Sequence, residues 1–236
     1  MDAYLTAVGN LVPSPSRYAA YLRLLFDGVP IDGRNVLDVG GGSGLISFYT
    51  AANGAKSVVC LDPAGDGSDP AMERHYHLLE AGVGGPVVKV RRRFQDLDPQ
   101  ETQYNILLVH NSVNHLDEDA CERLPAEDAR QSYTAIFSHL RSLLAPGGHL
   151  IMADCGRRNM WGDLHLPNVF APSIEWHIHQ QPDVWDELLV SCGFLPGRIR
   201  WDAPSRLRRP GQMVFGNRIG GYLTNSHFIL TSRAAD

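Results

Sequence analysis

Short apolar runs alternate along the chain with longer segments whose apolar residues have helical spacing. Runs at 35–39, 57–61, 86–90, 105–109 and 149–153 predict strands, as do two later ones at 198–201 and 227–231. Segments 45–52, 70–81, 126–144 and 183–192 predict helices. Continuously apolar strands separated by helices are typical of a parallel sheet with both faces covered. We therefore predict an α/β fold with a mostly parallel, doubly wound sheet.

The periodic pattern is weaker at three places, and these suggest how one domain over 1–236 is organised. Segment 16–27 follows a Ser/Pro start with apolar residues at helical spacing, so 1–30 is predicted to be an N-terminal helical cap. Stretches 155–182 and 203–226 lack a clear period and are predicted to be substrate-side insertions. The second is long for a strand connection and could instead form a subunit contact in a homodimer.

A glycine-rich loop directly follows the first predicted strand, in the pattern D-x-G-x-G-x-G from Asp38 to Gly44. Glycines allow a sharp turn and a close approach of the backbone to a ligand. The helix after them presents N–H groups suited to a carboxylate or phosphate. The second strand ends at Asp62, where a carboxylate can accept hydrogen bonds from both ribose hydroxyls. The loop therefore predicts a nucleoside site.

The register of this loop favours one kind of nucleoside. The dinucleotide pattern G-x-G-x-x-G is poorly met, because Ser47 stands where its last glycine should be. The carboxylate of Asp38 would repel a pyrophosphate but attract a cationic amino group. The loop thus indicates a nucleoside that carries an amino acid.

From 35 to 154 the sequence resembles the class I S-adenosylmethionine-dependent methyltransferase family, with weaker agreement to the end. Besides the loop, the resemblance rests on Phe-Gln-Asp-Leu at 94–97, the strand and edge at 104–116, and Leu-Ala-Pro-Gly-Gly-His-Leu at 144–150. It implies a Rossmann-like sheet of seven strands, methyltransferase activity and S-adenosyl-L-methionine as the cofactor.

The resemblance also implies a set of cofactor-binding residues. The glycines would hold the methionine portion, Asp62 the ribose, and Asp96 the adenine amine, although Asp96 beside Asp98 could equally be a turn acid. The implied set is Asp38, Gly40, Gly41, Gly42, Gly44, Asp62, Pro63, Gln95, Asp96, Leu97 and Asn111.

Two histidines near the fourth strand are candidates for a general base. Methylation of an alcohol or phenol requires loss of a proton, which a positioned histidine can accept. His115 is preferred, with a packed or helix-capping histidine as the rival interpretation. His110 is second, because its side chain could point into the core.

Composition narrows the remaining possibilities. The net charge is −5, which argues against a dedicated nucleic-acid binder, although seven arginines between 196 and 236 could form a local basic patch. Four widely spaced cysteines predict free thiols in the cytoplasm, and His177 with His179 lacks a clear third ligand, so no metal is expected. No apolar run is long enough to span a membrane, and the first residues do not resemble a signal peptide.

Several functions remain open. We expect O-methylation of a small-molecule acceptor, such as a sugar, a glycan or a secondary metabolite, with N-methylation as a close variant. An RNA or protein methyltransferase is an alternative, though the sequence at 109–112 lacks the Asn/Asp-Pro-Pro-Tyr motif. A nicotinamide-dependent oxidoreductase is a further alternative, of which the short-chain type is disfavoured because no Tyr-x-x-x-Lys is present. A non-catalytic nucleotide-binding protein is the last alternative.

Overall fold

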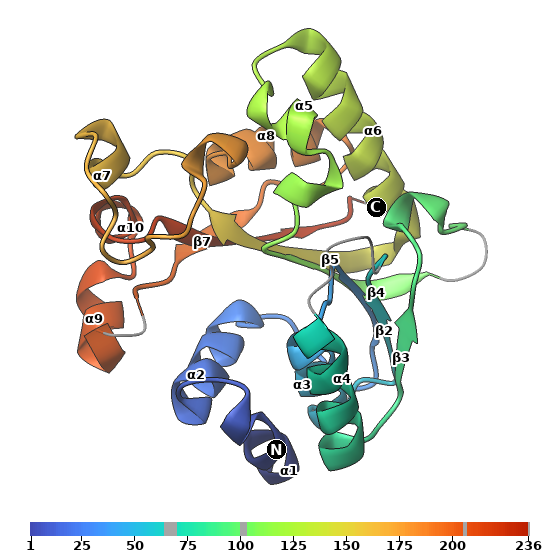
Figure 1. Cartoon of the computed structure of the whole chain (residues 1–236). Helices are drawn as coiled ribbons and strands as arrows, with labels where there is room; N and C mark the ends of the chain where they lie inside the picture. Colours follow the sequence, from blue (N-terminus) through green and yellow to red (C-terminus); the bar gives the residue numbers. More distant parts are fainter. Residues whose placement is uncertain (64–69, 100–102, 205–206, 236) are drawn as a thin grey trace. The chain divides into compact units, whose positions relative to one another are not determined.

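The computed structural model describes residues 1–63, 70–99, 103–204 and 207–235. Its strands form one seven-stranded sheet in the order β3-β2-β1-β4-β5-β7-β6, with helices on both faces (Figure 1). The chain divides into two compact units. Unit 1 is Met1–His110 with Ser142–Leu150, and unit 2 is Asn111–Arg141 with Ile151–Asp236. Each unit is described by itself.

Unit 1 contains the parallel strands around the glycine loop. β1 pairs in parallel with β2 on one side and with β4 on the other, so the strand order reverses at β1. Ligands of such sheets bind at the carboxyl ends of the strands beside this reversal. The elements are α1 (Asp2–Ala7), η1 (Val8–Asn10), α2 (Pro15–Leu25), β1 (Asn35–Val39), α3 (Leu45–Ala52), β2 (Ser57–Leu61), α4 (Pro70–Val83), β3 (Val87–Val90), η2 (Phe94–Asp96) and β4 (Tyr104–His110).

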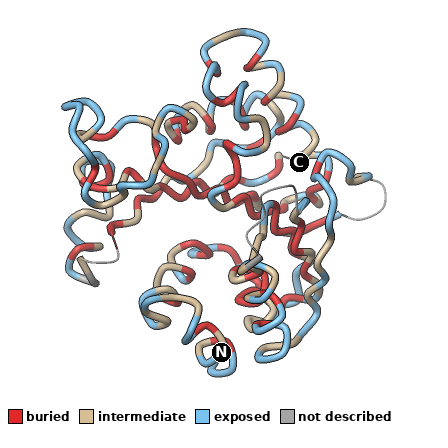
Figure 2. Tube along the Cα trace, viewed as in Figure 1, coloured by how far each residue is buried: buried red, intermediate tan, exposed pale blue. Residues whose placement is uncertain are grey.

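The core of unit 1 lies between its strands and the helices that pack on them. Leu37 and Leu107 are fully buried in neighbouring strands, as the continuous apolar runs require (Figure 2). Tyr4 of α1 is also buried, and its hydroxyl donates to the carbonyl of Leu45 at 2.8 Å. This bond attaches the N-terminal helices to the start of α3, directly after the glycine loop.

Unit 2 holds the antiparallel hairpin of the sheet and most of the irregular chain. β6 pairs antiparallel with β7, from Arg198 opposite Thr231 to Trp201 opposite Phe228. Two elements continue from one unit into the other, namely α6 (Glu127–Leu143) and β5 (Leu144–Cys155). The remaining elements are η3 (Asn114–Leu116), α5 (Glu118–Glu122), α7 (Met160–Asp163), η4 (Trp176–Ile178), α8 (Pro182–Ser191), β6 (Arg198–Trp201), α9 (Arg208–Phe215), α10 (Arg218–Leu223) and β7 (His227–Arg233).

An aromatic cluster forms the centre of unit 2. Tyr133 and Phe137 of α6 contact Trp185 of α8, with ring centroids 4.8 and 5.6 Å from the indole. The buried hydroxyl of Tyr133 donates to the carbonyl of Val113 at 2.9 Å, which satisfies its polar group. The helical spacing of these residues is therefore explained by packing.

The predicted α/β fold is confirmed, and the differences lie in the connections. The turn expected at 146–148 falls within β5, which begins at Leu144 directly after α6; Gly147, with φ +66°, lets the chain bend there without ending the strand. Segments 155–182 and 203–226 contain the short elements α7, η4, α9 and α10, which periodicity did not reveal. A helix of three to eight residues is too short to show a clear period.

Candidate functional site

The glycine loop turns through conformations that side chains rarely adopt. Gly40, Gly42 and Gly44 all have positive φ, at +74°, +51° and +76°. Gly44 precedes α3 in the left-handed region, and a Cβ there would lie 2.9 Å from Cδ2 of Tyr76 and 3.1 Å from Cε2 of Phe48. Any larger residue would therefore be both strained and overpacked, so the loop needs glycine at this position.

Asp38 lies beneath the loop at the end of β1. Its carboxyl group is 2% exposed and accepts a hydrogen bond of 2.6 Å from Oγ of Ser47, in the first turn of α3. Burial raises the pKa of Asp38 to about 6, although the Ser47 bond opposes this shift. Asp38 is therefore mostly ionised at neutral pH, with the hydroxyl of Ser47 as its hydrogen-bond donor.

Asp62 approaches the same loop from the end of β2. Its Oδ2 accepts a hydrogen bond of 3.0 Å from the backbone N–H of Gly42. Between the two acids, a Cβ on Gly41 would lie 2.7 Å from Sγ of Cys60 and 3.0 Å from Oδ2 of Asp38. The two carboxylates and the three glycines with positive φ are thus brought together in unit 1.

The remaining predicted cofactor residues have no contact with the glycine loop among the interactions described above. Pro63 is exposed, and Gln95 and Asp96 are exposed on η2, which is anchored by the buried ring of Phe94; Leu97 is half-buried. Asn111 begins unit 2 with φ +50°, and its N–H donates to the carbonyl of Ala153 at 2.8 Å. Their roles toward a cofactor stay predictions.

His110 forms a polar pair that the sequence analysis missed. Its Nε2 lies 2.7 Å from the hydroxyl of Tyr21, and the two rings meet edge to face at a centroid distance of 5.7 Å. Burial lowers the pKa of His110 to about 4, so the imidazole is neutral at physiological pH. It does not simply point into the apolar core, because it has a hydroxyl partner from α2.

The position of this pair follows from the strand register. Val109 of β4 is the partner of Val39 in β1, so His110 and Gly40 leave their strands at the same edge. On α2, Tyr18 stacks on Tyr21 with 6.2 Å between the ring centroids. The pKa of Tyr18 is raised mainly by burial and also by the nearby negative charge of Asp38. The half-buried tyrosines and His110 therefore lie by the glycine loop within unit 1.

From the sequence, Tyr18 and Tyr21 were interpreted only as apolar residues on one face of a helix. The available signal was the phenol hydroxyl, because a buried tyrosine hydroxyl normally needs a partner. The identity of that partner depends on packing between segments 89 positions apart.

His115, the preferred base from sequence, has a different environment. It belongs to η3 in unit 2, is 56% exposed, and its Nδ1 lies 2.5 Å from Oε1 of Glu118. Asp117, rather than His115, caps α5, because its side chain accepts from the N–H of Ala120. An exposed pair at i and i+3 is common on helix starts. The catalytic role of His115 stays a prediction.

The other polar side chains considered as ligands have structural partners. Nδ1 of His179 lies 3.1 Å from Oδ2 of Asp154, and both are buried in unit 2. His177 and His179 lie on and after η4 rather than on one face of a strand. The cysteines are free thiols, and over the part of the chain that the structure describes no group of three or more potential ligands could hold a metal ion.

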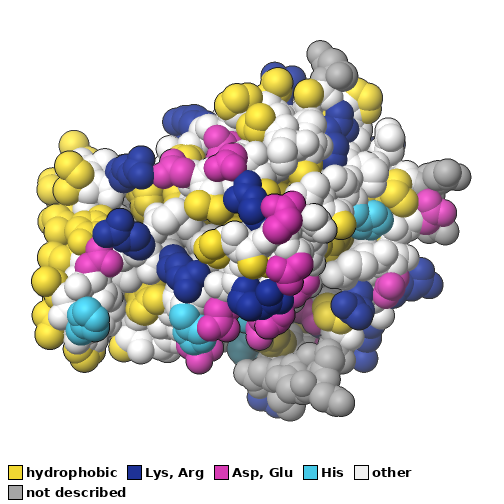
Figure 3. Space-filling view, turned by 90° about the horizontal axis from the view of Figure 1, so that it is seen from above, with side chains coloured by type: hydrophobic (Ala, Val, Ile, Leu, Met, Phe, Trp, Pro, Cys, Tyr) yellow, Lys and Arg dark blue, Asp and Glu magenta, His cyan; other side chains and the backbone are white. Residues whose placement is uncertain are grey.

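Two of the seven arginines considered for a basic patch between 196 and 236 have partners within unit 2. Arg200 is 9% exposed and donates to Oγ1 of Thr231, and Arg218 pairs with Asp183. Arg206 lies outside the described residues. Figure 3 shows basic and acidic side chains interspersed on the face it presents. Among the described helices, none has the length and apolar character needed to cross a membrane.

Comparisons with known proteins identify the family and the fold. A family described as a methyltransferase domain matches residues 15–176. The chain is 29% identical over 188 residues to a tRNA U34 carboxymethyltransferase of Chromohalobacter salexigens, a match that covers 75% of this chain and 49% of the relative. The chain thus spans about half the length of this curated relative.

Two solved structures have a similar fold. A putative S-adenosylmethionine-dependent methyltransferase from Listeria monocytogenes superposes with a TM-score of 0.62 at 14% identity, covering 94% of this chain and 98% of that one. Magnesium protoporphyrin IX methyltransferase from Synechocystis, solved with bound S-adenosylmethionine, gives a TM-score of 0.56 at 15% identity, covering 94% and 81%. At these identities the similarity concerns the fold.

Proposed function

Because the chain belongs to the methyltransferase-domain family and is an S-adenosylmethionine-dependent methyltransferase, we propose that it methylates a hydroxyl group of a small molecule. The observation that carries this proposal is the pair of Tyr21 and neutral His110 beside the glycine loop. A hydroxyl acceptor must lose a proton when it is methylated, and this pair can receive one.

The residues present fit the cofactor. The positive-φ glycines leave backbone accessible, Asp38 offers a buried carboxylate to the amino group of the methionine portion, and Asp62 can accept from the ribose hydroxyls. When bound, S-adenosylmethionine supplies a methyl group on a sulfonium, which is already activated. The protein therefore has to align the acceptor, exclude water and handle the proton.

The proton of the acceptor hydroxyl can pass through Tyr21 to His110, and the Tyr21 side chain is neutral before and after the transfer. As the acceptor oxygen forms its bond to the methyl carbon, its O–H becomes strongly acidic and donates its proton to the oxygen of Tyr21. Tyr21 donates its own proton to Nε2 of His110, which lies 2.7 Å away. His110 is left as the imidazolium. A low histidine pKa suffices, because the proton leaves an oxygen that is becoming positively charged.

Cofactor affinity should depend on pH through Asp38. The pKa of about 6 means that Asp38 is protonated as the pH falls below that value and can no longer pair with an ammonium group. Calorimetry with S-adenosylhomocysteine should show the affinity falling about tenfold between about pH 7 and pH 5. In Asp38→Asn the affinity should be weaker at neutral pH and nearly constant over this range. A wild-type affinity that is independent of pH would contradict this role.

The acceptor class can be tested with matched compounds. Hydroxyl acceptors and their amine counterparts, including sugars and phenols, would be incubated with S-adenosylmethionine and analysed by mass spectrometry. We expect methylated ethers with the hydroxyl series. Tyr21→Phe should lower this turnover while cofactor affinity is unchanged, because it removes the hydroxyl but keeps the ring. Methylation confined to the amine series would overturn O-methylation.

A nucleic-acid acceptor is a second candidate, favoured by the similarity to the tRNA carboxymethyltransferase. Unmodified tRNA would be incubated with S-adenosylmethionine or with a carboxymethyl-sulfonium analogue of it, and digested nucleosides would be analysed by mass. A carboxymethyl or methyl group on tRNA, without turnover of any small acceptor, would establish this candidate in place of the first.

A further inference from the structure

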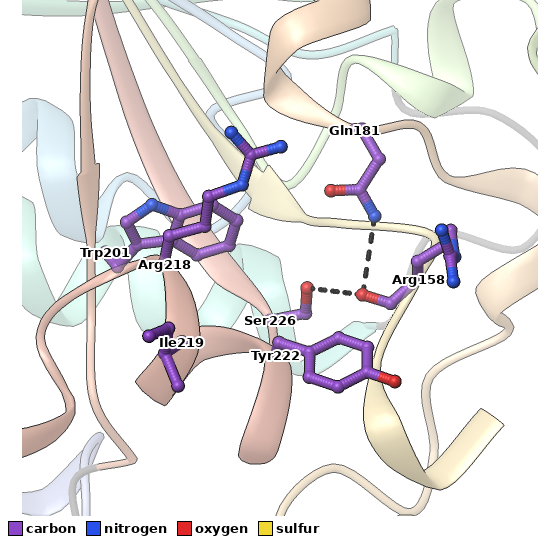
Figure 4. A pocket seen from close by; sticks show the side chains of 7 residues that line it. All are labelled: Arg158, Gln181, Trp201, Arg218, Ile219, Tyr222 and Ser226. Atoms are coloured by element: carbon purple, nitrogen blue, oxygen red, sulfur yellow. Dashed lines mark hydrogen bonds between the residues drawn. The ribbon is translucent and has the colours of Figure 1, made fainter. Parts of the chain in front are cut away.

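Unit 2 contains a pocket of about 410 Å³ that is partly open to solvent and is lined by residues of neither the glycine loop nor the Tyr21–His110 pair. This volume lies within the range of small-molecule sites. Its walls come from both segments that lacked a clear sequence period, and from the end of β6. The lining residues are Arg158, Gln181, Trp201, Arg218, Ile219, Tyr222 and Ser226 (Figure 4).

Hydrogen bonds hold the two segments that line the pocket together. The carbonyl of Arg158 accepts from Oγ of Ser226 at 3.0 Å and from Nε2 of Gln181 at 3.3 Å. The side chains of Trp161 and Asn168 donate to the carbonyls of residues 223 and 224. The segments at 156–168 and 220–226 are therefore fastened to each other around the cavity.

Two rings and an aliphatic side chain make much of the wall apolar. Trp201 is largely buried, whereas Ile219 is 72% exposed and Tyr222 is partly exposed. Gly221 of α10 fits against the indole so closely that a Cβ would lie 2.3 Å from Cε3 of Trp201. Such flat walls match a planar ring, and the exposed Ile219 offers apolar surface that a ligand would cover.

The two arginines that line the pocket differ in the direction of their side chains and in their partners. Figure 4 shows the guanidinium of Arg218 extending beside Trp201, while the side chain of Arg158 turns away from the other lining residues. Arg158 and the hydroxyl of Tyr222 both bind Asp163. Arg218 donates a hydrogen bond of 2.7 Å from Nη2 to Oδ2 of Asp183. Its remaining N–H groups can bind a further acid.

We propose that this cavity binds a flat aromatic ligand that carries a carboxylate, with the ring between Trp201 and Tyr222 and the carboxylate on Arg218. A single negative charge suits the site better than a phosphate dianion, because Asp183 already lies on the same guanidinium. The exposed pair between Arg218 and Asp183 contributes little stability, so a ligand can share the arginine at small cost. The ligand can be the methyl acceptor or another molecule, since the proposal concerns binding alone.

The test separates ring from charge with four probes measured by calorimetry. Naphthoate has both features, naphthalenemethanol has the ring alone, decanoate has the carboxylate without a ring, and naphthyl phosphate has the ring with a dianion. We expect naphthoate to bind about tenfold more tightly than each of the other three. Equal or tighter binding of decanoate or of naphthyl phosphate would overturn the proposed ligand class.

Substitutions of the lining residues test whether naphthoate binds in this pocket. Arg218→Gln should weaken naphthoate about tenfold and leave naphthalenemethanol unchanged, whereas Tyr222→Leu should weaken both aromatic probes. Arg123→Gln is the matched control, because Arg123 is an exposed arginine of unit 2 that is paired with Asp119 and Asp128 and does not line the cavity. Naphthoate affinity that is unchanged in Arg218→Gln would place its binding elsewhere and refute the site.

A second variant acts on the shape of the cavity. Gly221→Ala should displace the Trp201 ring and weaken naphthoate, and unchanged affinity in a folded protein would contradict the proposed ring position. Binding of S-adenosylhomocysteine by the same variants is the folding control, since none of these residues belongs to the glycine loop. Loss of naphthoate binding with intact S-adenosylhomocysteine binding is therefore distinct from a failure of the methyltransferase assignment.

Discussion

His110→Gln is expected to lower kcat by ~10²–10⁴ for a hydroxyl acceptor, the range typical of a lost general base. Glutamine can keep a hydrogen bond to Tyr21 but cannot accept its proton. Because His110 has a pKa of about 4, the wild-type rate should not depend on this group from about pH 6 upward. Steady-state kinetics and calorimetry with S-adenosylhomocysteine would together show a loss of rate with unchanged cofactor affinity.

His115→Ala provides the comparison, because both histidines were candidates from sequence. On the proposed mechanism its rate should stay within a factor of about three of the wild type, since it removes an exposed pair with Glu118. The opposite result, a full loss in His115→Ala with an active His110→Gln, would make His115 the base.

Asp62→Ala should weaken S-adenosylhomocysteine about a hundredfold or more. Each charge-assisted hydrogen bond to a ribose hydroxyl is worth ~1.5–3 kcal/mol, and two such bonds are proposed. The variant also removes the acceptor for the N–H of Gly42, so the loop loses a contact that helps to hold its shape. Calorimetry measures the loss directly.

The control for Asp62 is another carboxylate of unit 1 outside the loop. Glu80 of α4 is half-exposed and pairs with His77, so Glu80→Ala should bind S-adenosylhomocysteine like the wild type. If Asp62→Ala also binds normally and remains folded, the ribose role proposed for Asp62 is wrong.

The parts of the fold that were predictable are those set by residues close together in sequence. Strands such as 57–61 matched the structure because they are short apolar runs, buried by helices on both faces. The helix at 45–52 was predicted for a similar reason, since the glycines that precede it mark its start. By contrast, α9 and α10 are stabilised by their packing in unit 2, so their short sequences carried little signal.

The candidate site divides in the same way. The acid and glycines from 38 to 44 form one continuous segment, so their register indicated a nucleoside that carries an amino acid. The resemblance to the methyltransferase family then implied S-adenosylmethionine, which the family match supports. Asp62 was found because it follows the neighbouring strand. Tyr21 was missed because its partner His110 is 89 positions away, and only the pairing of β1 with β4 and the packing of α2 bring them together.

The sequence by itself therefore determined an α/β fold, because the strands and helices depend on short-range patterns of burial and backbone conformation. Its resemblance to the methyltransferase family added the activity and the cofactor. Only the tertiary structure decided which histidine has a hydroxyl partner. It also decided that two segments without a clear sequence period line a pocket against Trp201. The physical reason is that burial, pKa and hydrogen-bond partners are set by contacts between distant segments. The proposed donor site therefore rests largely on one continuous segment, while recognition of other molecules depends on surfaces that folding assembles.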